Sequence, residues 1–365
     1  MDGFFYQLLL MNIYDIIIEQ IIIDGCCLMG RDLSINLKET KYMSKEYTNC
    51  MRGIFAILVV IHHLYQYSGL FRGTYIGVIL QLFGFVSVAM FFFFSGYGLM
   101  LSADKKNYIE HFFRKRFLPL YCFYVFLIVL YSVWTIIIEN SISFGKVIQS
   151  FFFGGTIVTN GWYLQATFVT YLLYYFVFRV FKSPKMRIIF FSIGILAYCV
   201  ICRLLELGIN WYQTIPCVVL GMIFMANKKK IDALFRKYAW IIFIMCSMLF
   251  AGCFVLSSVS KVDVIFDMLY SLFFVCAMIT LSYMLSNTVI INNKLMTLVG
   301  KYSLEIYVAH GLFLRLIKLE YIKNVYIYIL VVIGGTAVSS VILKKLYEKI
   351  VWLFQEKISS KRHIS

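Results

Sequence analysis

Apolar residues run along this chain in long stretches that short polar loops separate. Each stretch approaches the roughly 20 residues that an α-helix needs to cross a bilayer. The predicted spans are 52–70, 76–101, 117–138, 161–181, 187–207, 211–226, 239–259, 264–285, 301–319 and 325–347. No long polar insertion interrupts them. The pattern therefore predicts an all-α, polytopic integral membrane protein with about ten transmembrane helices.

The composition agrees with this pattern and argues against a soluble protein. Of the 365 residues, 62% are hydrophobic and only 14% are charged, whereas a soluble domain is about half apolar and a quarter charged. A net charge of +16 could suggest nucleic acid, but the cations fall in short clusters between the apolar spans. We therefore expect membrane lipids, and no nucleic acid, as partners.

Basic residues mark alternate loops. The clusters are Lys105, Lys106, Arg114, Lys115 and Arg116; then Arg179, Lys182, Lys185 and Arg187; then Lys228, Lys229, Lys230, Arg236 and Lys237. The intervening loops are sparser or charge-balanced, although the last outward loop, with Lys318, Glu320 and Lys323, fits less well. Positive charge marks the cytoplasmic side. This predicts two cytoplasmic termini and a multi-pass cell-membrane protein, with a bacterial cytoplasmic membrane as the expected location.

The two ends of the chain fall outside the predicted membrane domain, which we place at 43–350. Residues 1–42 are apolar, but Asp15, Glu19 and Asp24 interrupt them, which suits neither a secretory signal nor an ordinary span. Two interpretations stay open: an interfacial helix, or a segment upstream of a natural start at Met43. Residues 351–365 are predicted to form a basic cytoplasmic tail.

The first span, RGIFAILVVIHHLYQYSG, carries Arg52 and the pair His62 and His63. Ionisable groups inside a membrane are costly and usually functional. Arg52 and His63 are eleven positions apart, which is three helical turns plus about 20° and roughly 16 Å of rise. His62 points about 80° away from Arg52. One helix face therefore holds a cation near the cytoplasmic surface and a titratable base near mid-bilayer.

A second histidine, His310, lies near the middle of the ninth span. Two histidines at matching depth favour a shared polar cavity, and histidine suits general-base chemistry near neutrality. Glu305 is about 140° around the helix from His310, so it is not the expected partner. No metal site is predicted, because the one CxxC, at Cys199 and Cys202, has no second pair.

A basic cluster, HFFRKRFLPLY, enters the third span. Its guanidinium groups, Arg114 and Arg116, suit phosphate binding, although a topology anchor explains Lys115. Pro119 is expected to distort the first turn of that span. Two further segments are weaker: FFFFSGYGLM, whose Ser95, Gly96 and Gly98 suit close helix packing, and NGWYL, whose Trp162 fits an interfacial anchor.

Taken in order, five segments resemble the acyltransferase family 3 of membrane O-acyltransferases. They are Arg52 with His63, FFFFSGYGL, RKRFLP, GWYL and GKYSLEIYVAH. The resemblance implies transfer of an acyl group, usually acetyl, from cytoplasmic acyl-CoA (acetyl-CoA) to a hydroxyl of a surface or exported glycan or its lipid-linked precursor. It also implies a carbohydrate or glycolipid acceptor, and a separate extracytoplasmic transferase partner if the acyl group is relayed outward.

The resemblance also assigns roles to residues. Arg52 and His63 match the essential first-helix motif, Arg116 matches the arginine before the third-helix proline, and His310 matches a histidine of many relatives. Phe113 stands where many relatives have a second arginine, so Arg114 is a substitute whose direction differs by about 100°.

In the implied mechanism, Arg52, Arg114 and Arg116 hold the CoA phosphates and His63 is the general base. His310 either donates to the oxyanion or orients the acceptor, with His62 and Trp162 in support. The competing hypothesis is a permease or flippase whose buried histidines relay protons.

Overall fold

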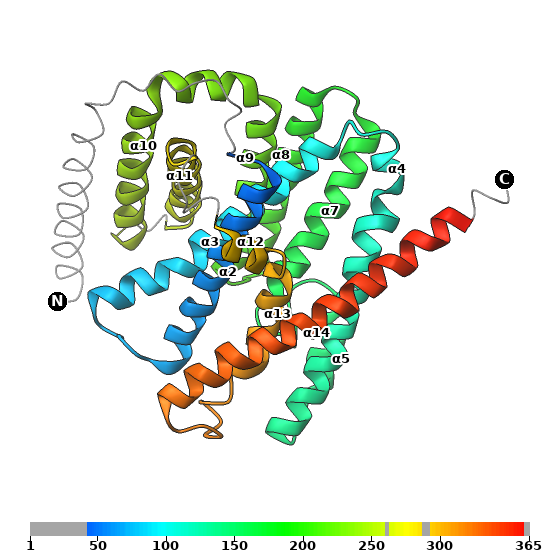
Figure 1. Cartoon of the computed structure of the whole chain (residues 1–365), viewed down its shortest axis with the longest axis vertical. Coiled ribbons are helices and arrows are strands. Elements are labelled where there is room, and N and C mark those ends of the chain that lie inside the picture. The colour runs from blue at the N-terminus through cyan, green and yellow to red at the C-terminus, as the bar shows by residue number, and fades with distance from the viewer. Residues whose placement is uncertain (1–41, 260–262, 287–292, 361–365) are drawn as a thin grey trace.

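The apolar stretches form helices whose ends follow local sequence signals. The computed structural model describes residues 42–259, 263–286 and 293–360, and their regular secondary structure is helical throughout (Figure 1). Helix α2 (Lys45–Ser68) begins after Ser44, whose hydroxyl accepts a hydrogen bond from the Tyr47 N–H at 3.1 Å. It ends at Gly69, whose φ of 71° is in the left-handed region that glycine adopts without strain.

The other helices follow α2 in chain order. They are α3 (Tyr75–Ser102), α4 (Tyr108–Phe112), α5 (Leu118–Glu139), α6 (Phe144–Ser150), α7 (Trp162–Val180), α8 (Pro184–Leu204), α9 (Pro216–Ala226), α10 (Lys228–Val259), α11 (Asp263–Met284), α12 (Lys294–Gly300), α13 (Ser303–Leu314) and α14 (Val325–Ser360). A π-helical turn, η1 (Phe113–Phe117), joins α4 to α5, and a short 3-10 turn, η2 (Ile209–Trp211), precedes α9.

Within the described ranges, eight helical segments are long and apolar enough to cross a membrane. They are Lys45–Ser68, Tyr75–Ser102, Tyr108–Glu139, Pro184–Leu204, Ile209–Ala226, Lys228–Val259, Val264–Met284 and Val325–Gln355. These correspond to eight of the ten predicted spans, so the multi-pass helical architecture is confirmed. The count of ten and the location of the termini are not.

The two remaining spans are helices of a different kind. The predicted span 161–181 is α7, whose Gln165, Thr167 and Thr170 are buried polar residues that lower its apolar content. The predicted span 301–319 is wrong in its length, because α13 ends at Leu314 and has 12 residues. Twelve residues rise about 18 Å, well short of the roughly 30 Å hydrocarbon core.

Helix α2 lies at the centre of the fold, where it packs against α3, α12 and α13 (Figure 1). Glycine permits the contact with α12: a Cβ at Gly53 would overlap the Met296 carbonyl oxygen, and one at Gly300 would overlap that of Asn49. A second glycine pair joins α3 to α9, where Cβ atoms at Gly96 or Gly221 would overlap the facing backbone. The small residues predicted to suit close packing therefore do so at Gly96, whereas Gly98 faces open space.

Tyr42, the last residue before the predicted boundary of the membrane domain, is packed against the described helices. Tyr42 is buried, stacks edge-on against Tyr283 with 5.1 Å between ring centroids, and donates a hydrogen bond to Asp232 of α10. Burial and that hydrogen bond raise the pKa of the Tyr42 hydroxyl, which keeps it a donor. Tyr42 thus packs with the membrane domain. The rest of the predicted N-terminal extension, and residues 361–365 of the predicted tail, lie outside the described residues.

Candidate active site

Arg52 lines a cavity of about 380 Å³ at one end of α2. We call it the cationic cavity. Its lining comes from α2, α3, α4, η1, α5, α7, α13 and α14, and includes Arg52, Ser95, Gly98, Tyr108, Arg116, Tyr163, Thr167, Tyr171, Ser303, Tyr307 and Tyr347. The volume falls in the usual range of small-molecule sites.

The two arginines of the cationic cavity lack acidic partners. In the part of the chain that the structure describes, no carboxylate lines the cavity, and none of the ion pairs involves Arg52 or Arg116. The Arg52 guanidinium instead lies over the Phe94 ring, 5.8 Å from its centroid, and Arg116 lies near the hydroxyl groups of three tyrosines. Two guanidinium groups without counter-charges form a site for an anion, and planar guanidinium suits phosphate in particular.

The two arginines of the basic cluster, Arg114 and Arg116, lie in the π-helical turn η1 and have different surroundings. In η1 the Leu118 N–H donates a hydrogen bond to the carbonyl oxygen of Phe113, five residues earlier. Pro119 follows in the first turn of α5. The distortion expected in the first turn of the span is thus in η1, which directly precedes α5. All three cations of this turn are exposed, but only Arg116 lines the cationic cavity, whereas Arg114 and Lys115 do not. The structure therefore brings Arg116, and not Arg114, to Arg52.

Deeper along α2, His63 meets His310 of α13. The two imidazole rings stack with 5.2 Å between centroids and 22° between planes. The side-chain nitrogen of Asn160 lies 3.0 Å from Nε2 of His63 and 3.4 Å from Nε2 of His310. The Asn160 amide therefore bridges two histidines on different helices.

The hydrogen bonds on the other ring nitrogens define the tautomers. Nδ1 of His310 lies 3.0 Å from the Ile306 carbonyl oxygen, which can only accept, so Nδ1 carries the proton. Nδ1 of His63 lies 3.0 Å from Oε1 of Gln66, which assigns its proton in the same way. Both Nε2 atoms are then lone-pair acceptors that face the Asn160 N–H groups. Such a lone pair is what a general base presents to a hydroxyl.

The cationic cavity ends next to these histidines. Tyr307 lines the cavity, and its ring lies 5.9 Å from the His310 ring. Its hydroxyl donates a hydrogen bond to the backbone carbonyl oxygen of Asn160 at 3.0 Å. Tyr163 lies beside it, 5.0 Å from the Tyr307 ring. The two tyrosines thus separate the arginines from the histidines.

His62 contacts His63 but forms its hydrogen bond with α3. Its Nδ1 lies 3.0 Å from the Leu80 carbonyl oxygen of α3, and its ring fits against Gly84, where a Cβ would lie 2.5 Å from Nε2. The His62 ring also contacts that of His63 edge-on, at 4.8 Å. His62 therefore lies between His63 and α3, and its printed hydrogen bond goes to α3 and not to Asn160.

The NGWYL segment contains Trp162, whose supporting role stays a prediction, and Asn160, which the sequence did not single out. Trp162 packs edge-on against Tyr163 and near Trp211, and it does not line the cationic cavity. Asn160, two residues earlier, makes the bridge, with a φ of 60° that asparagine tolerates better than most residues. The Asn-Gly pair before a helix was the available signal.

Glu305 does not pair with His310, as its helical direction predicted. It is fully buried and forms an ion pair with Lys344 of α14, with 3.4 Å between Nζ and Oε1. This pair holds α13, which carries Tyr307 and His310, against α14.

The family comparison agrees with this geometry. The family model described as an acyltransferase domain, Acyl_transf_3, matches residues 45–344, which is most of the chain and includes Arg52, His63, Arg116, Asn160 and His310. Searches of curated proteins and of solved structures give no match. This chain belongs to the acyltransferase 3 family and is a membrane acyltransferase.

Proposed function

We propose that this protein transfers an acyl group, in the simplest case acetyl, from acyl-CoA to a hydroxyl of a surface or exported glycan or its lipid-linked precursor. The observation that carries the proposal is one helix with both halves of such a site. Arg52 and Arg116 form a cavity for an anion at one end of α2, and His63 presents an Nε2 lone pair roughly 16 Å along it. That rise is of the same order as the pantetheine arm of CoA.

The cationic cavity suits the phosphates of the donor. Arg52 and Arg116 supply the guanidinium groups, and the hydroxyls of Tyr108 and Tyr171 line the same cavity. The thioester would extend past Tyr163 and Tyr307 to the histidines, which those two tyrosines border. The exposed Arg114 would contact the CoA only outside the cavity, and its predicted role stays a prediction.

His63 would act as the general base. Its Nε2 takes the proton of the acceptor hydroxyl, the hydroxyl oxygen attacks the thioester carbonyl carbon, and the C–S bond breaks as the ester forms. The proton then passes from His63 to the departing CoA sulfur. A positioned base contributes about 10²–10⁴-fold to such a rate.

Asn160 is the better-placed oxyanion donor. The His310 tautomer leaves Nε2 without a proton, so neutral His310 accepts there instead of donating. The acceptor hydroxyl would replace the Asn160 N–H at Nε2 of His63, and the released N–H would turn to the developing oxyanion. One such donor contributes about 10²–10³-fold. His310 would orient the acceptor hydroxyl, and His62 would support the His63 ring.

The experiment supplies acetyl-labelled acetyl-CoA to membranes that contain the wild type, His63→Ala or no protein, and then isolates the glycan fraction. We expect label in the glycans only with the wild type. Equal label in all three samples would contradict the proposal. Movement of unlabelled glycan across the membrane without label incorporation would favour the permease instead.

A further inference from the structure

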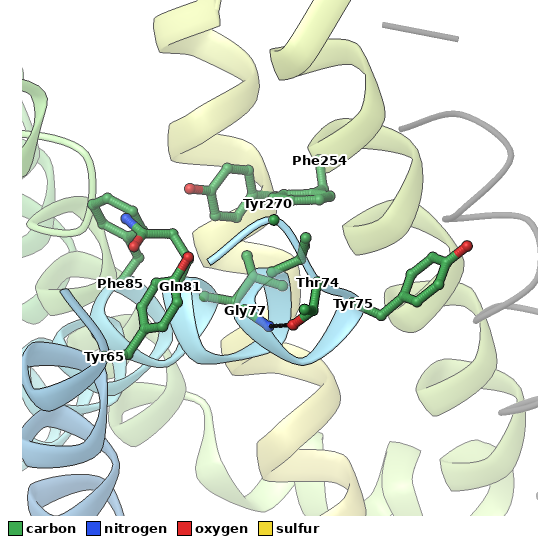
Figure 2. Close-up of a pocket in the computed structure, with 11 residues that line it drawn as sticks. Tyr65, Thr74, Tyr75, Gly77, Gln81, Phe85, Phe254 and Tyr270 are labelled. Atoms are coloured by element: carbon green, nitrogen blue, oxygen red, sulfur yellow. Dashed lines mark hydrogen bonds between the residues drawn. The ribbon is translucent and has the colours of Figure 1, made fainter. Parts of the chain in front are cut away.

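A second cavity, of about 500 Å³, lies at the end of α2 opposite Arg52. We call it the neutral cavity. Its lining includes Tyr65 from α2, Tyr75, Gln81 and Phe85 from α3, Phe254 from α10 and Tyr270 from α11. Figure 2 shows the rings of Phe254 and Tyr270 across from the first turns of α3, with Tyr65, Gln81 and Phe85 grouped at one side.

The neutral cavity contains polar groups with no partner in the protein. Among the described residues, no hydrogen bond uses the hydroxyls of Tyr65 and Tyr75 or the side-chain amide of Gln81, and all three line the cavity. The Thr74 hydroxyl, by contrast, is occupied, because it accepts from the Gly77 N–H at 3.2 Å and donates to the Phe71 carbonyl oxygen at 2.7 Å. Tyr65 and Gln81 lie together at one side of the cavity, whereas Tyr75 is 51% exposed and its hydroxyl points away from them (Figure 2). The Tyr65 hydroxyl and the Gln81 amide, beside aromatic rings, suit a ligand with both apolar faces and hydroxyls.

The absence of charge narrows the ligand class. No charged side chain of the described residues lines the neutral cavity, so an anionic ligand such as CoA finds no counter-charge there. Gln213 donates a hydrogen bond to the Tyr270 hydroxyl, which fixes that ring and its hydroxyl from behind. A neutral polyol, whose hydroxyls pair with tyrosine and amide groups and whose C–H faces stack on rings, matches this lining better than an acyl chain, which would leave the polar groups unpaired.

The neutral cavity adjoins the histidines from the side opposite the cationic cavity. Phe85, in its lining, lies 6.4 Å from the His62 ring, and the His62 ring lies 4.8 Å from that of His63. Gln81 follows Leu80, whose carbonyl oxygen accepts from His62. A sugar held here would lie beyond the His62 ring from His63, as a glycosyl residue next to the one whose hydroxyl reaches Nε2 of His63.

We propose that the neutral cavity, formed by Tyr65, Tyr75, Gln81, Phe85, Phe254 and Tyr270, binds a neutral glycosyl residue of the acceptor. This inference rests on the proposed acyl transfer for its role, but the binding itself requires no acyl-CoA. Substrates then enter from opposite ends of α2, the donor at Arg52 and the acceptor at Tyr65.

The experiment is saturation-transfer NMR on the purified full-length chain in lipid nanodiscs without acyl-CoA. The probes are the methyl glycosides of glucose, galactose, rhamnose and N-acetylglucosamine. We expect transfer to at least one probe with the wild type, and at least a tenfold loss of that signal with Gln81→Leu and with Phe254→Ala. Gln81 is only partly buried, so its variant tests the site without emptying the core. Tyr326→Ala, on an aromatic residue of α14 that is 72% exposed and lines neither cavity, is the matched control and should bind as the wild type does.

No transfer to any of the four probes, or equal transfer in Gln81→Leu and the wild type, would overturn the proposal and leave the cavity to a lipid chain. Label transfer from acetyl-CoA to glycans, measured in parallel, separates the two proposals. Sugar binding without label transfer removes the proposed function and keeps the sugar site. If no sugar binds, and Gln81→Leu and Phe254→Ala transfer label as the wild type does, the sugar site alone is refuted.

Discussion

The cationic and neutral cavities are built on the same two helices, yet they differ in charge. Helices α2 and α3 line both: Arg52 and Ser95 at one end, Tyr65 and Gln81 at the other. The cationic cavity has two guanidinium groups without acidic partners in the described residues, whereas the neutral cavity has unpaired hydroxyl and amide groups. His62 and His63 lie between them. The difference indicates that a helix pair supplies the frame and a few side chains at each end select the ligand.

The largest expected effect on acyl transfer is at His63, which lies between the two cavities. We expect His63→Ala to reduce acyl transfer by about 10²–10⁴-fold, because it removes the base itself. His62→Ala should reduce it less than about tenfold, because His62 bonds to the Leu80 carbonyl oxygen and not to Asn160. The measurement is kcat for label transfer from acetyl-CoA. A larger loss of kcat with His62→Ala than with His63→Ala would contradict His63 as the base and point to His62.

A smaller effect is expected at the cationic end. Arg52→Ala or Arg116→Ala should raise the KM for acyl-CoA by roughly 10–100-fold, since a hydrogen bond to a charged group contributes about 1.5–3 kcal/mol. The exposed Lys115 is the matched control, and Lys115→Ala should leave KM unchanged. Dephospho-CoA thioesters lack the 3′-phosphate, so their KM should exceed that of acyl-CoA by less in the arginine variants than in the wild type. If KM rises equally with Lys115→Ala, the general positive charge of this region, and not the cavity, attracts the donor.

The smallest effect separates two glycines of α3: Gly84, which faces the His62 ring, and Gly98, which lines the cationic cavity. A Cβ at Gly84 would meet the His62 ring at 2.5 Å, whereas a Cβ at Gly98 meets nothing within 4 Å. Gly84→Ala should therefore destabilise the protein by about 1–3 kcal/mol, the usual cost of overpacking. Gly98→Ala should leave thermal stability unchanged. The check is the midpoint of thermal unfolding in detergent, and equal midpoints for both variants would mean that His62 moves freely at this contact.

Local sequence was sufficient for the parts of this protein that depend on one helix. The apolar runs predicted eight of the membrane-spanning segments, because crossing lipid requires a continuous apolar surface of known length. Helical periodicity likewise predicted that Glu305 does not pair with His310, and Glu305 pairs instead with Lys344 of α14. Local sequence failed at α13, where a short helix inside the bundle has an apolar composition similar to that of a span.

Only the tertiary structure decided how these helices form one site. Asn160 is 97 residues from His63 and 150 from His310, and no local pattern states which of the polar residues before α7 will face them. The π-helical turn with Arg116, and not Arg114, in the cationic cavity packs in the same way against the distant helices α7 and α14. Local periodicity determines which face a side chain occupies, but the packing of distant helices determines what that face meets. The sequence by itself therefore determined the membrane architecture and the single-helix pair of Arg52 and His63, while the bridge through Asn160 and the two cavities came only from the fold.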